Sequence, residues 1–266
     1  MSLTISSVQN PRVKSAARLR DRKGRDEQGR TLIEGARELF LAIQAGVTIS
    51  EVYVCSSLCE LHEAQAVLAQ LDDLDTDVIE VTPIVLEKLA YGERLDGVVA
   101  VIDTPRVSFT DWQLPPDAML AVIDGVEKPG NIGAILRSAD AAGLAGVIVT
   151  GKGTDLYNPN TIRASLGTIF SVKVAQAEAG ETLAWLRKRG FGLYSARVDA
   201  TRMYDSADYR RPTAFILGSE AHGLANDWHA ADITPIRLPM LGLADSLNVS
   251  ATAAVLFYEA RRQRKS

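Results

Sequence analysis

The chain has 266 residues, of which 47% are hydrophobic, and a formal net charge of −4. This length and apolar content can bury cores for two domains without disulfides or structural metals. The apolar runs are far shorter than the roughly 20 residues of a membrane-spanning helix, and no apolar leader with a small-residue cleavage site begins the chain, so we expect a cytoplasmic protein without a membrane span.

Positive charge is concentrated at the start of the chain. The first 30 residues hold eight Lys and Arg residues against three acidic ones, so the remainder carries a net charge of −9. Residues 10–28 of this block are compatible with a helix. A basic helix is typical of phosphate contacts in nucleic-acid-binding proteins, although a solvated helix face has the same composition. The candidate RNA-binding residues are Arg12, Lys14, Arg18, Arg20, Arg22 and Arg37.

The chain then alternates between strand and helix patterns. Runs rich in β-branched residues predict strands, and apolar residues at helical spacing predict helices. The predicted strands are residues 31–35, 49–55, 77–81 and 97–102, and the predicted helices are residues 36–45, 61–71 and 83–91. This alternation predicts a small α/β domain over residues 1–103.

Two cysteines and a histidine in this domain have a spacing that resembles a zinc site. They are Cys55, Cys59 and His62, whereas His222 and His229 lie far along the chain. A closed structural zinc site needs four ligands, usually in two paired clusters. We therefore expect two reduced cysteines beside a buried strand, and no metal.

Residues 104–117 contain three prolines among polar residues, so we expect regular structure to lapse there and predict a linker. The predicted strands that follow are residues 119–123, 146–150, 192–196, 213–217 and 233–238, and the predicted helices are residues 132–142, 160–169, 181–188 and 247–262. Such alternation favours a mostly parallel sheet covered on both faces. The second predicted domain therefore spans residues 118–266.

Two glycine-rich segments resemble nucleotide-binding motifs without matching them. Residues 124–133 open a helix after a strand, but their glycines lack the dinucleotide spacing. Residues 146–153 are one residue short of a P-loop and place a β-branched strand where that motif has a loop. No serine lies in a Gly-x-Ser-x-Gly turn. These observations argue against a nicotinamide enzyme, an NTPase and a serine hydrolase.

Three further segments follow predicted strands, where parallel sheets bind ligands. They are residues 131–137 (Asn-Ile-Gly-Ala-Ile-Leu-Arg), 217–224 (Leu-Gly-Ser-Glu-Ala-His-Gly-Leu) and 238–250 (Leu-Pro-Met-Leu-Gly-Leu-Ala-Asp-Ser-Leu-Asn-Val-Ser). Each has an ordinary structural interpretation by itself. Asn131, Ser246 and Asn248 could cap helices. Arg137 could be a surface residue, and Glu220 could be a carboxylate that a helix dipole favours.

Together these segments resemble, in the same order, the signature motifs of the SpoU, or TrmH-type, family of RNA ribose 2′-O-methyltransferases. The motifs are an Asn and an Arg on one helix, then Gly-x-Glu-x-x-Gly, then Pro-Met followed by Ser-Leu-Asn-Val-Ser. The first half is more loosely similar to the substrate-binding domain of the ribosomal-RNA branch. This second similarity rests on Gln-Asn-Pro-Arg at residues 9–12 and Leu-Ile-Glu-Gly-Ala-Arg-Glu at residues 32–38.

The resemblance implies S-adenosylmethionine as cofactor, a homodimer and a deep trefoil knot in the second domain. Knots are exceptions to ordinary topology that hydrophobic periodicity does not predict. The matching positions for cofactor contacts are Gly218, Leu238 and Leu247. The last helix would pack in the dimer through an apolar stripe formed by Val249, Ala253, Leu256 and Ala260. A helix that covers its own sheet would show the same stripe.

The resemblance also implies the catalytic residues, which are Asn131, Arg137, Glu220, Ser246 and Asn248. The first-motif arginine is held in this family to activate the ribose hydroxyl, but a guanidinium stays protonated and accepts protons poorly. We therefore expect Arg137 to bind an adjacent phosphate and to stabilise the developing alkoxide. Glu220 would order this arginine, and the remaining three would donate or accept hydrogen bonds.

These features predict an S-adenosylmethionine-dependent methyltransferase that modifies a ribose 2′-hydroxyl in ribosomal RNA of the 23S type. A tRNA substrate, and an RNA-binding assembly factor without catalysis, remain as alternatives. A small-molecule methyltransferase would leave the basic block without a purpose.

Overall fold

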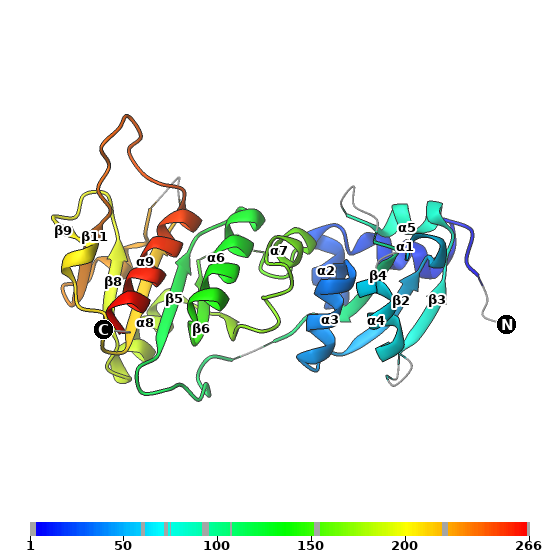
Figure 1. The fold of residues 1–266 in the computed structure, drawn as a ribbon, viewed down its shortest axis with the longest axis horizontal. Helices are drawn as coiled ribbons and strands as arrows, with labels where there is room; N and C mark the ends of the chain where they lie inside the picture. Colours follow the sequence, from blue (N-terminus) through cyan, green and yellow to red (C-terminus); the bar gives the residue numbers. More distant parts are fainter. Residues whose placement is uncertain are drawn as a thin grey trace. The chain divides into compact units, whose positions relative to one another are not determined.

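The computed structural model describes residues 4–59, 62–71, 74, 76–91, 96–106, 108–151, 155–219 and 223–264. The chain divides into two compact units (Figure 1). The first unit comprises Met1–Pro105 and Tyr157–Ser171, and the second comprises Arg106–Leu156 and Val172–Ser266.

The first unit contains a four-stranded sheet with the order β1-β4-β2-β3. Its strands are β1 (Arg30–Glu34), β2 (Ile49–Val54), β3 (Asp77–Glu80) and β4 (Val98–Asp103). β4 is antiparallel to β1 and β2, whereas β2 and β3 are parallel. The Val-Val-Ala-Val-Ile sequence of β4 is buried throughout, which suits its place between two other strands.

Helices from two parts of the chain complete this unit. They are α1 (Pro11–Arg18), α2 (Arg22–Gln28), α3 (Ala36–Gln44), α4 (His62–Leu71), α5 (Pro83–Leu89) and α7 (Pro159–Ala164). Apolar residues of α1 and α5 share one core cluster with the sheet, as Val13, Leu86 and Val99 illustrate. A short 3-10 helix, Ser56–Leu58, follows β2.

The basic stretch forms two helices, α1 and α2, because the chain bends sharply after Arg18. A Cβ on Gly24 would lie 2.0 Å from the Arg18 carbonyl oxygen, so only glycine permits this approach. The buried Arg25 donates Nη1 hydrogen bonds to the carbonyls of Leu19 (2.7 Å) and Arg20 (2.9 Å), which the end of α1 leaves without helical partners. Arg25 is therefore a structural cation within the basic block.

The segment Tyr157–Ser171 joins the first unit although it lies far along the chain. Thr31 Oγ1 donates to the Tyr157 carbonyl (2.7 Å), and a Cβ on Gly167 would lie 2.9 Å from Leu41 Cδ1 of α3. The prediction of one helix over residues 160–169 is wrong in its second half. α7 ends at Ala164, and Leu166 takes a left-handed φ of 51°, which stops a right-handed helix.

The second unit contains a seven-stranded parallel sheet with the order β7-β6-β5-β10-β8-β11-β9 (Figure 1). Its strands are β5 (Met119–Asp124), β6 (Gly146–Thr150), β7 (Val174–Gln176), β8 (Gly192–Ala196), β9 (Arg202–Met203), β10 (Thr213–Gly218) and β11 (Ile233–Arg237). The predicted mostly parallel sheet is confirmed. β7 and β9 were not predicted, since strands of three and two residues carry too little pattern.

Three longer helices pack on this sheet: α6 (Pro129–Ala142), α8 (Ala179–Lys188) and α9 (Val249–Arg264). α6 and α9 lie side by side (Figure 1). The α9 stripe of Val249, Ala253, Leu256 and Ala260 is already buried within the single chain, where α9 packs on α6 and β10. The prediction that this stripe forms a dimer interface is therefore wrong. Two 3-10 helices, Tyr204–Ser206 and Asn226–His229, connect strands.

The predicted linker is anchored to the second unit from Arg106 onward. Its described residues form no helix or strand, but Phe109 and Trp112 are only 3% and 5% exposed. Phe109 meets the Trp185 ring of α8 edge-on at 5.1 Å, and Trp112 packs where a Cβ on Gly146 would lie 2.5 Å away. Aromatic burial thus fixes a segment that proline content alone marks as irregular.

None of the helices in the described part of the chain is long and apolar enough to cross a membrane. Among the described residues, no three His, Cys, Asp or Glu side chains are placed to bind a metal ion together. Cys55 and Cys59 are free and buried, and burial raises the pKa of the Cys59 thiol.

Candidate functional site

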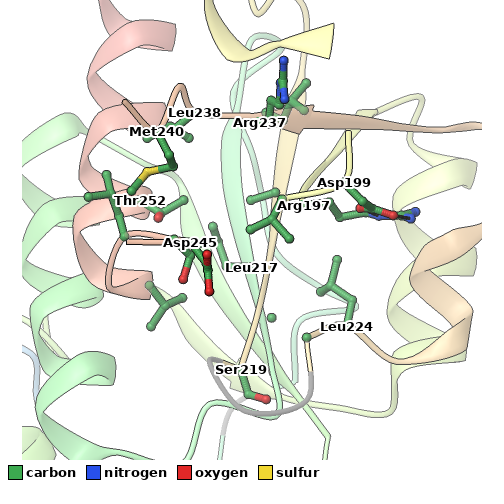
Figure 2. Close-up of a pocket in the computed structure, with 18 of the residues that line it drawn as sticks. Arg197, Asp199, Leu217, Ser219, Leu224, Arg237, Leu238, Met240, Asp245 and Thr252 are labelled. Atoms are coloured by element: carbon green, nitrogen blue, oxygen red, sulfur yellow. Dashed lines mark hydrogen bonds and ion pairs between the residues drawn. The ribbon is translucent and has the colours of Figure 1, made fainter. Parts of the chain in front are cut away.

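A cavity of about 550 Å³ lies at the carboxyl ends of β8, β10 and β11 (Figure 2). This is the end of a parallel sheet where ligands bind, and the volume is within the range of small-molecule sites. Its lining residues come from the segment after β8, the end of β10, and the connection from β11 into α9. The fold therefore brings residues from three separate loops to one cavity.

Gly218, Leu238 and Leu247, the residues predicted to contact a cofactor, all line this cavity. Gly218 is required by close backbone approach, because a Cβ there would lie 2.5 Å from the carbonyl carbon of Gly223. Ser219 and Gly223 exchange two backbone hydrogen bonds of 3.0 Å each. Gly218, Ser219 and Gly223 therefore lie in close backbone contact at one side of the cavity.

Charged side chains lie on opposite sides of the cavity (Figure 2). Arg197 donates two hydrogen bonds to Asp199, from Nε to Oδ1 (2.9 Å) and from Nη2 to Oδ2 (2.5 Å). This pairing lowers the pKa of the Asp199 carboxyl and raises the pKa of Arg197. Across the cavity lie Asp245 and Met240. The cavity can therefore hold a ligand that combines apolar groups with groups of both charges.

These charged residues were not among the predicted site residues. Arg197 comes directly after β8, and the carboxyl ends of parallel strands are where such residues gather. Asp245 lies within the third predicted motif. Their positions in the sequence thus contained a usable signal, but only the fold places Arg197 and Asp245 on the same cavity.

Two predicted catalytic residues meet directly. Asn248 Nδ2 donates to Asn131 Oδ1 (3.0 Å), although the two residues are 117 positions apart. Asn248 Oδ1 also accepts from the Ser250 backbone N–H (2.9 Å) at the start of α9. Asn131 lies in the first turn of α6, so this contact joins the beginnings of two neighbouring helices. Ser246, two residues before Asn248, lines the cavity.

The other two predicted catalytic residues are placed differently. Arg137 lies on α6 and is exposed, about 9 Å along the helix axis from Asn131. It is not among the described residues that line the cavity. Glu220 lies outside the described residues, as does His222.

The predicted RNA-binding residues are on the surface of the first unit. Several pair with carboxylates: Arg12 with Asp77 (2.8 Å), Arg18 with Glu27, and Arg22 with Asp26 (3.7 Å). Exposed pairs of this kind are weak because solvent screens them, so a phosphate can replace the carboxylate.

The remaining three candidates are arranged differently. Arg20 places its guanidinium 5.8 Å from the centre of the Tyr91 ring and donates to the Lys88 carbonyl (3.2 Å). Lys14 and Arg37 are exposed. All six candidates therefore offer side chains that a polyanion could reach.

Residues 118–258 match the SpoU rRNA Methylase family, and residues 10–100 match the MRM3-like substrate binding domain. A curated relative, the 23S rRNA (uridine(2479)-2′-O)-methyltransferase of Streptomyces viridochromogenes, is 32% identical over 264 residues, covering 94% of this chain and 88% of that protein.

Two solved structures are also similar. One, described as an RNA 2′-O ribose methyltransferase, is 43% identical with a TM-score of 0.87 and covers 99% of this chain and 100% of that one. The other is the SpoU methyltransferase AviRb of Streptomyces viridochromogenes in complex with AdoMet. It is 30% identical with a TM-score of 0.88, covering 97% of this chain and 99% of that one. The similarity extends over both units.

Proposed function

We propose that this chain, which belongs to the SpoU rRNA methylase family, transfers a methyl group from S-adenosylmethionine to a ribose 2′-hydroxyl of 23S-type ribosomal RNA. The observation that carries the proposal is the cavity lined by Gly218, Leu238 and Leu247, in direct chain continuity with the hydrogen-bonded Asn248 and Asn131. Asn131 and Asn248 would then belong to the same site as the cofactor cavity.

The cavity suits S-adenosylmethionine chemically. The backbone around Gly218, Leu238 and Leu247 would hold the adenine, and Arg197 and Asp245 lie where they could meet the charged amino-acid end. When bound, this cofactor supplies an electrophilic methyl group on a sulfonium. The protein's own task is to place one ribose oxygen in line with that methyl group and to exclude other nucleophiles.

The catalytic roles follow from the chemistry of each side chain. Arg137 is exposed on α6, where an incoming RNA phosphate can reach it, and its permanent positive charge would stabilise the developing alkoxide. The hydroxyl proton would pass to that phosphate or to water. Glu220 would order the arginine. Asn131, Ser246 and Asn248 would position the ribose and the surrounding loops through hydrogen bonds.

We also propose the domain organisation that the sequence suggests. Residues 1–103 bind the RNA substrate through Arg12, Lys14, Arg18, Arg20, Arg22 and Arg37. Residues 118–266 would form the methyltransferase domain, apart from Tyr157–Ser171, which belongs to the first unit. Residues 104–117 would connect the two domains, with Phe109 and Trp112 buried in the second unit. The match of residues 10–100 to a substrate binding domain supports this division. We place this enzyme in the cytoplasm.

We propose that the loops that precede β11 and the connection from β11 to α9 together form the deep trefoil knot of the family. Two observations support it: both loops line one cavity, and α9 then packs back on α6. When the unfolded chain is pulled from its two ends, its end-to-end length should stay below the full length of 266 extended residues, because a knot tightens and retains part of the chain. A chain that extends to its whole contour length is unknotted.

A homodimer through the second domain is the proposed assembly. Large apolar side chains on this domain are exposed: Leu241 and Leu243 are fully exposed, and Tyr258 is about half exposed. Such exposure is typical of surfaces that a partner covers. Sedimentation should give twice the 28.7 kDa chain mass, and the mass of a single chain would contradict the proposal.

The function is tested by incubating the protein with labelled S-adenosylmethionine and separately purified 23S rRNA, 16S rRNA and tRNA. We expect label in 23S rRNA, at one ribose that resists cleavage on its 3′ side because its 2′-hydroxyl is blocked. Label confined to tRNA would overturn the substrate class. Absence of label from every RNA, with cofactor binding intact, would favour the RNA-binding factor without catalysis.

A further inference from the structure

Asp124, the last residue of β5, is a buried carboxylate beside the cavity wall. Its side chain accepts two hydrogen bonds, from Thr150 Oγ1 to Oδ1 (2.8 Å) and from the Ala225 backbone N–H to Oδ2 (2.9 Å). Thr150 ends β6, and Ala225 follows Gly223 and Leu224, which line the cavity. One carboxylate therefore joins the ends of two strands to the chain that forms the wall.

A buried carboxylate is unfavourable at this position unless hydrogen bonds or ion pairs satisfy it. Asp124 is 4% exposed, and the five other residues of β5 are apolar and buried. Burying a charged group costs free energy that only hydrogen bonds or ion pairs offset. Hydrogen bonds from N–H and O–H groups to a carboxylate are shorter and stronger than those to neutral acceptors. The two bonds thus account for the presence of an acid here.

The backbone around Asp124 fixes the direction of its carboxylate. Gly125 takes a φ of 63°, and its N–H donates to the Thr150 carbonyl (3.0 Å). A Cβ on Gly151 would lie 2.8 Å from Gly125 N, so the chain after β6 lies directly against the chain after β5. The carboxylate is therefore held toward Ala225 from a rigid base.

We propose that Asp124 is a positioning residue of the cofactor site. Its carboxylate holds the Ala225 N–H, and this contact fixes Gly223 and Leu224 where they form the cavity wall. Gly218 leaves room for the same segment on the β10 side, since a Cβ there would lie 2.5 Å from the Gly223 carbonyl carbon. The consequence for the cofactor rests on the proposed function, whereas the anchoring of Ala225 does not.

Three substitutions separate anchoring from general packing. Asp124→Ala removes both hydrogen bonds. Asp124→Asn keeps them, because its Oδ1 can accept from Ala225 N–H while its Nδ2 donates to the Thr150 hydroxyl, which can reverse its role. Combining Asp124→Asn with Thr150→Val removes the acceptor for that Nδ2 group but keeps Oδ1 as the acceptor for the Ala225 N–H, so exchange of the Ala225 amide should stay close to that of Asp124→Asn.

Thr213→Val is the matched control for reduced stability. Thr213 is a buried hydroxyl at the opposite end of the neighbouring strand β10, where it donates to the Arg211 carbonyl (2.8 Å). The substitution removes a buried hydrogen bond from the same unit without touching the cavity.

The first measurement is the hydrogen-exchange rate of the Ala225 amide in the cofactor-free protein. Asp124→Ala should accelerate it by about tenfold or more, the scale of removing one hydrogen bond to a charged group, relative to Asp124→Asn, the double variant and Thr213→Val. The second is the affinity for S-adenosylhomocysteine by calorimetry, which Asp124→Ala should weaken by about tenfold.

Unchanged Ala225 exchange in Asp124→Ala would overturn the proposal, as would equal acceleration in Asp124→Ala and Thr213→Val. Accelerated exchange with unaltered affinity would also overturn it, because the wall would then not need this anchor. If the wild-type protein bound no S-adenosylhomocysteine while exchange still responded to Asp124, the anchoring would stand and the proposed function would fail.

Discussion

Side-chain chemistry at the proposed site separates binding from catalysis. Gly218, Leu238 and Leu247 line the cavity, whereas Arg137 is exposed on α6 and is not among its described lining residues. A residue that meets the RNA and not the cofactor should affect methyl transfer alone. This separation can be tested one residue at a time.

Arg137→Ala should lower methyl transfer by at least about 100-fold and leave cofactor affinity nearly unchanged, because it removes one electrostatic stabiliser of the transition state. Single-turnover transfer of labelled methyl to RNA measures the first quantity, and calorimetry measures the second. Arg137→Lys keeps the charge but loses the planar guanidinium, so its rate of methyl transfer should lie between those of the wild type and Arg137→Ala. Turnover equal to that of the wild type would remove Arg137 from the mechanism.

Asn248→Ala should cost about 1 kcal/mol of stability through loss of the α9 cap, and should also lower methyl transfer because the hydrogen bond from Asn248 to Asn131 is lost. Asn10→Ala is the control, since Asn10 caps α1 through a 2.9 Å hydrogen bond from the Arg12 N–H, in the other unit. Thermal unfolding and transfer rates should show equal stability losses but a slower reaction only for Asn248→Ala. Equal rates for both variants would limit Asn248 to capping.

At the scale of elements, the segment before β5 shows how aromatic side chains override an irregular sequence. Phe109 and Trp112 are buried, Trp185 Nε1 donates to the Thr110 carbonyl (3.5 Å), and Lys173 Nζ donates to the Gln113 carbonyl (2.8 Å). These two carbonyls are thus satisfied by side chains instead of by a helix or sheet. The segment that the sequence marks as a linker therefore contributes to the core of the second unit.

Trp112→Ala should destabilise the second unit by about 3–5 kcal/mol, the usual cost of removing a buried tryptophan. Gln113→Ala, at the neighbouring exposed position, should change stability by less than about 0.5 kcal/mol. Calorimetric unfolding of both variants provides the comparison. A loss below about 1 kcal/mol for Trp112→Ala would show that the segment is held by its backbone contacts alone.

At the scale of the whole molecule, positive charge is concentrated in the first 30 residues of the chain. The net charge of −4 hides a strongly basic start, which forms α1, α2 and the turn between them. Carboxylates such as Asp77 and Glu27 occupy some of these cations in the protein alone. RNA binding must therefore compete with exposed ion pairs as well as with salt.

Lys14→Ala and Arg37→Ala should each reduce the slope of log affinity against log salt by roughly 0.7 for every phosphate of single-stranded RNA that the replaced side chain neutralises. Lys188→Ala, an exposed cation in the last turn of α8, should leave this slope unchanged. Filter binding of RNA over a range of salt concentrations gives the slopes. Identical slopes for all three variants would place the RNA elsewhere on the protein.

The sequence by itself determined the α/β class and most element positions, because hydrophobic period is a local property of neighbouring residues. It also contained the three motifs, whose glycines and polar residues are recognisable without a structure. The sequence also led to the wrong prediction that the α9 stripe lies in a dimer interface. The helical spacing of Ala253 and Leu256 is the same whether a partner or their own sheet covers them.

Only the tertiary structure decided which distant residues are in contact. Asn131 and Asn248 touch because α6 and α9 lie side by side, and Arg197 and Asp245 share one cavity because β8 and β11 end beside each other. The same holds for Asp124, which reaches Ala225 across 101 positions of the chain. Contacts between distant residues depend on strand order and helix packing, and periodicity along the chain carries no record of either.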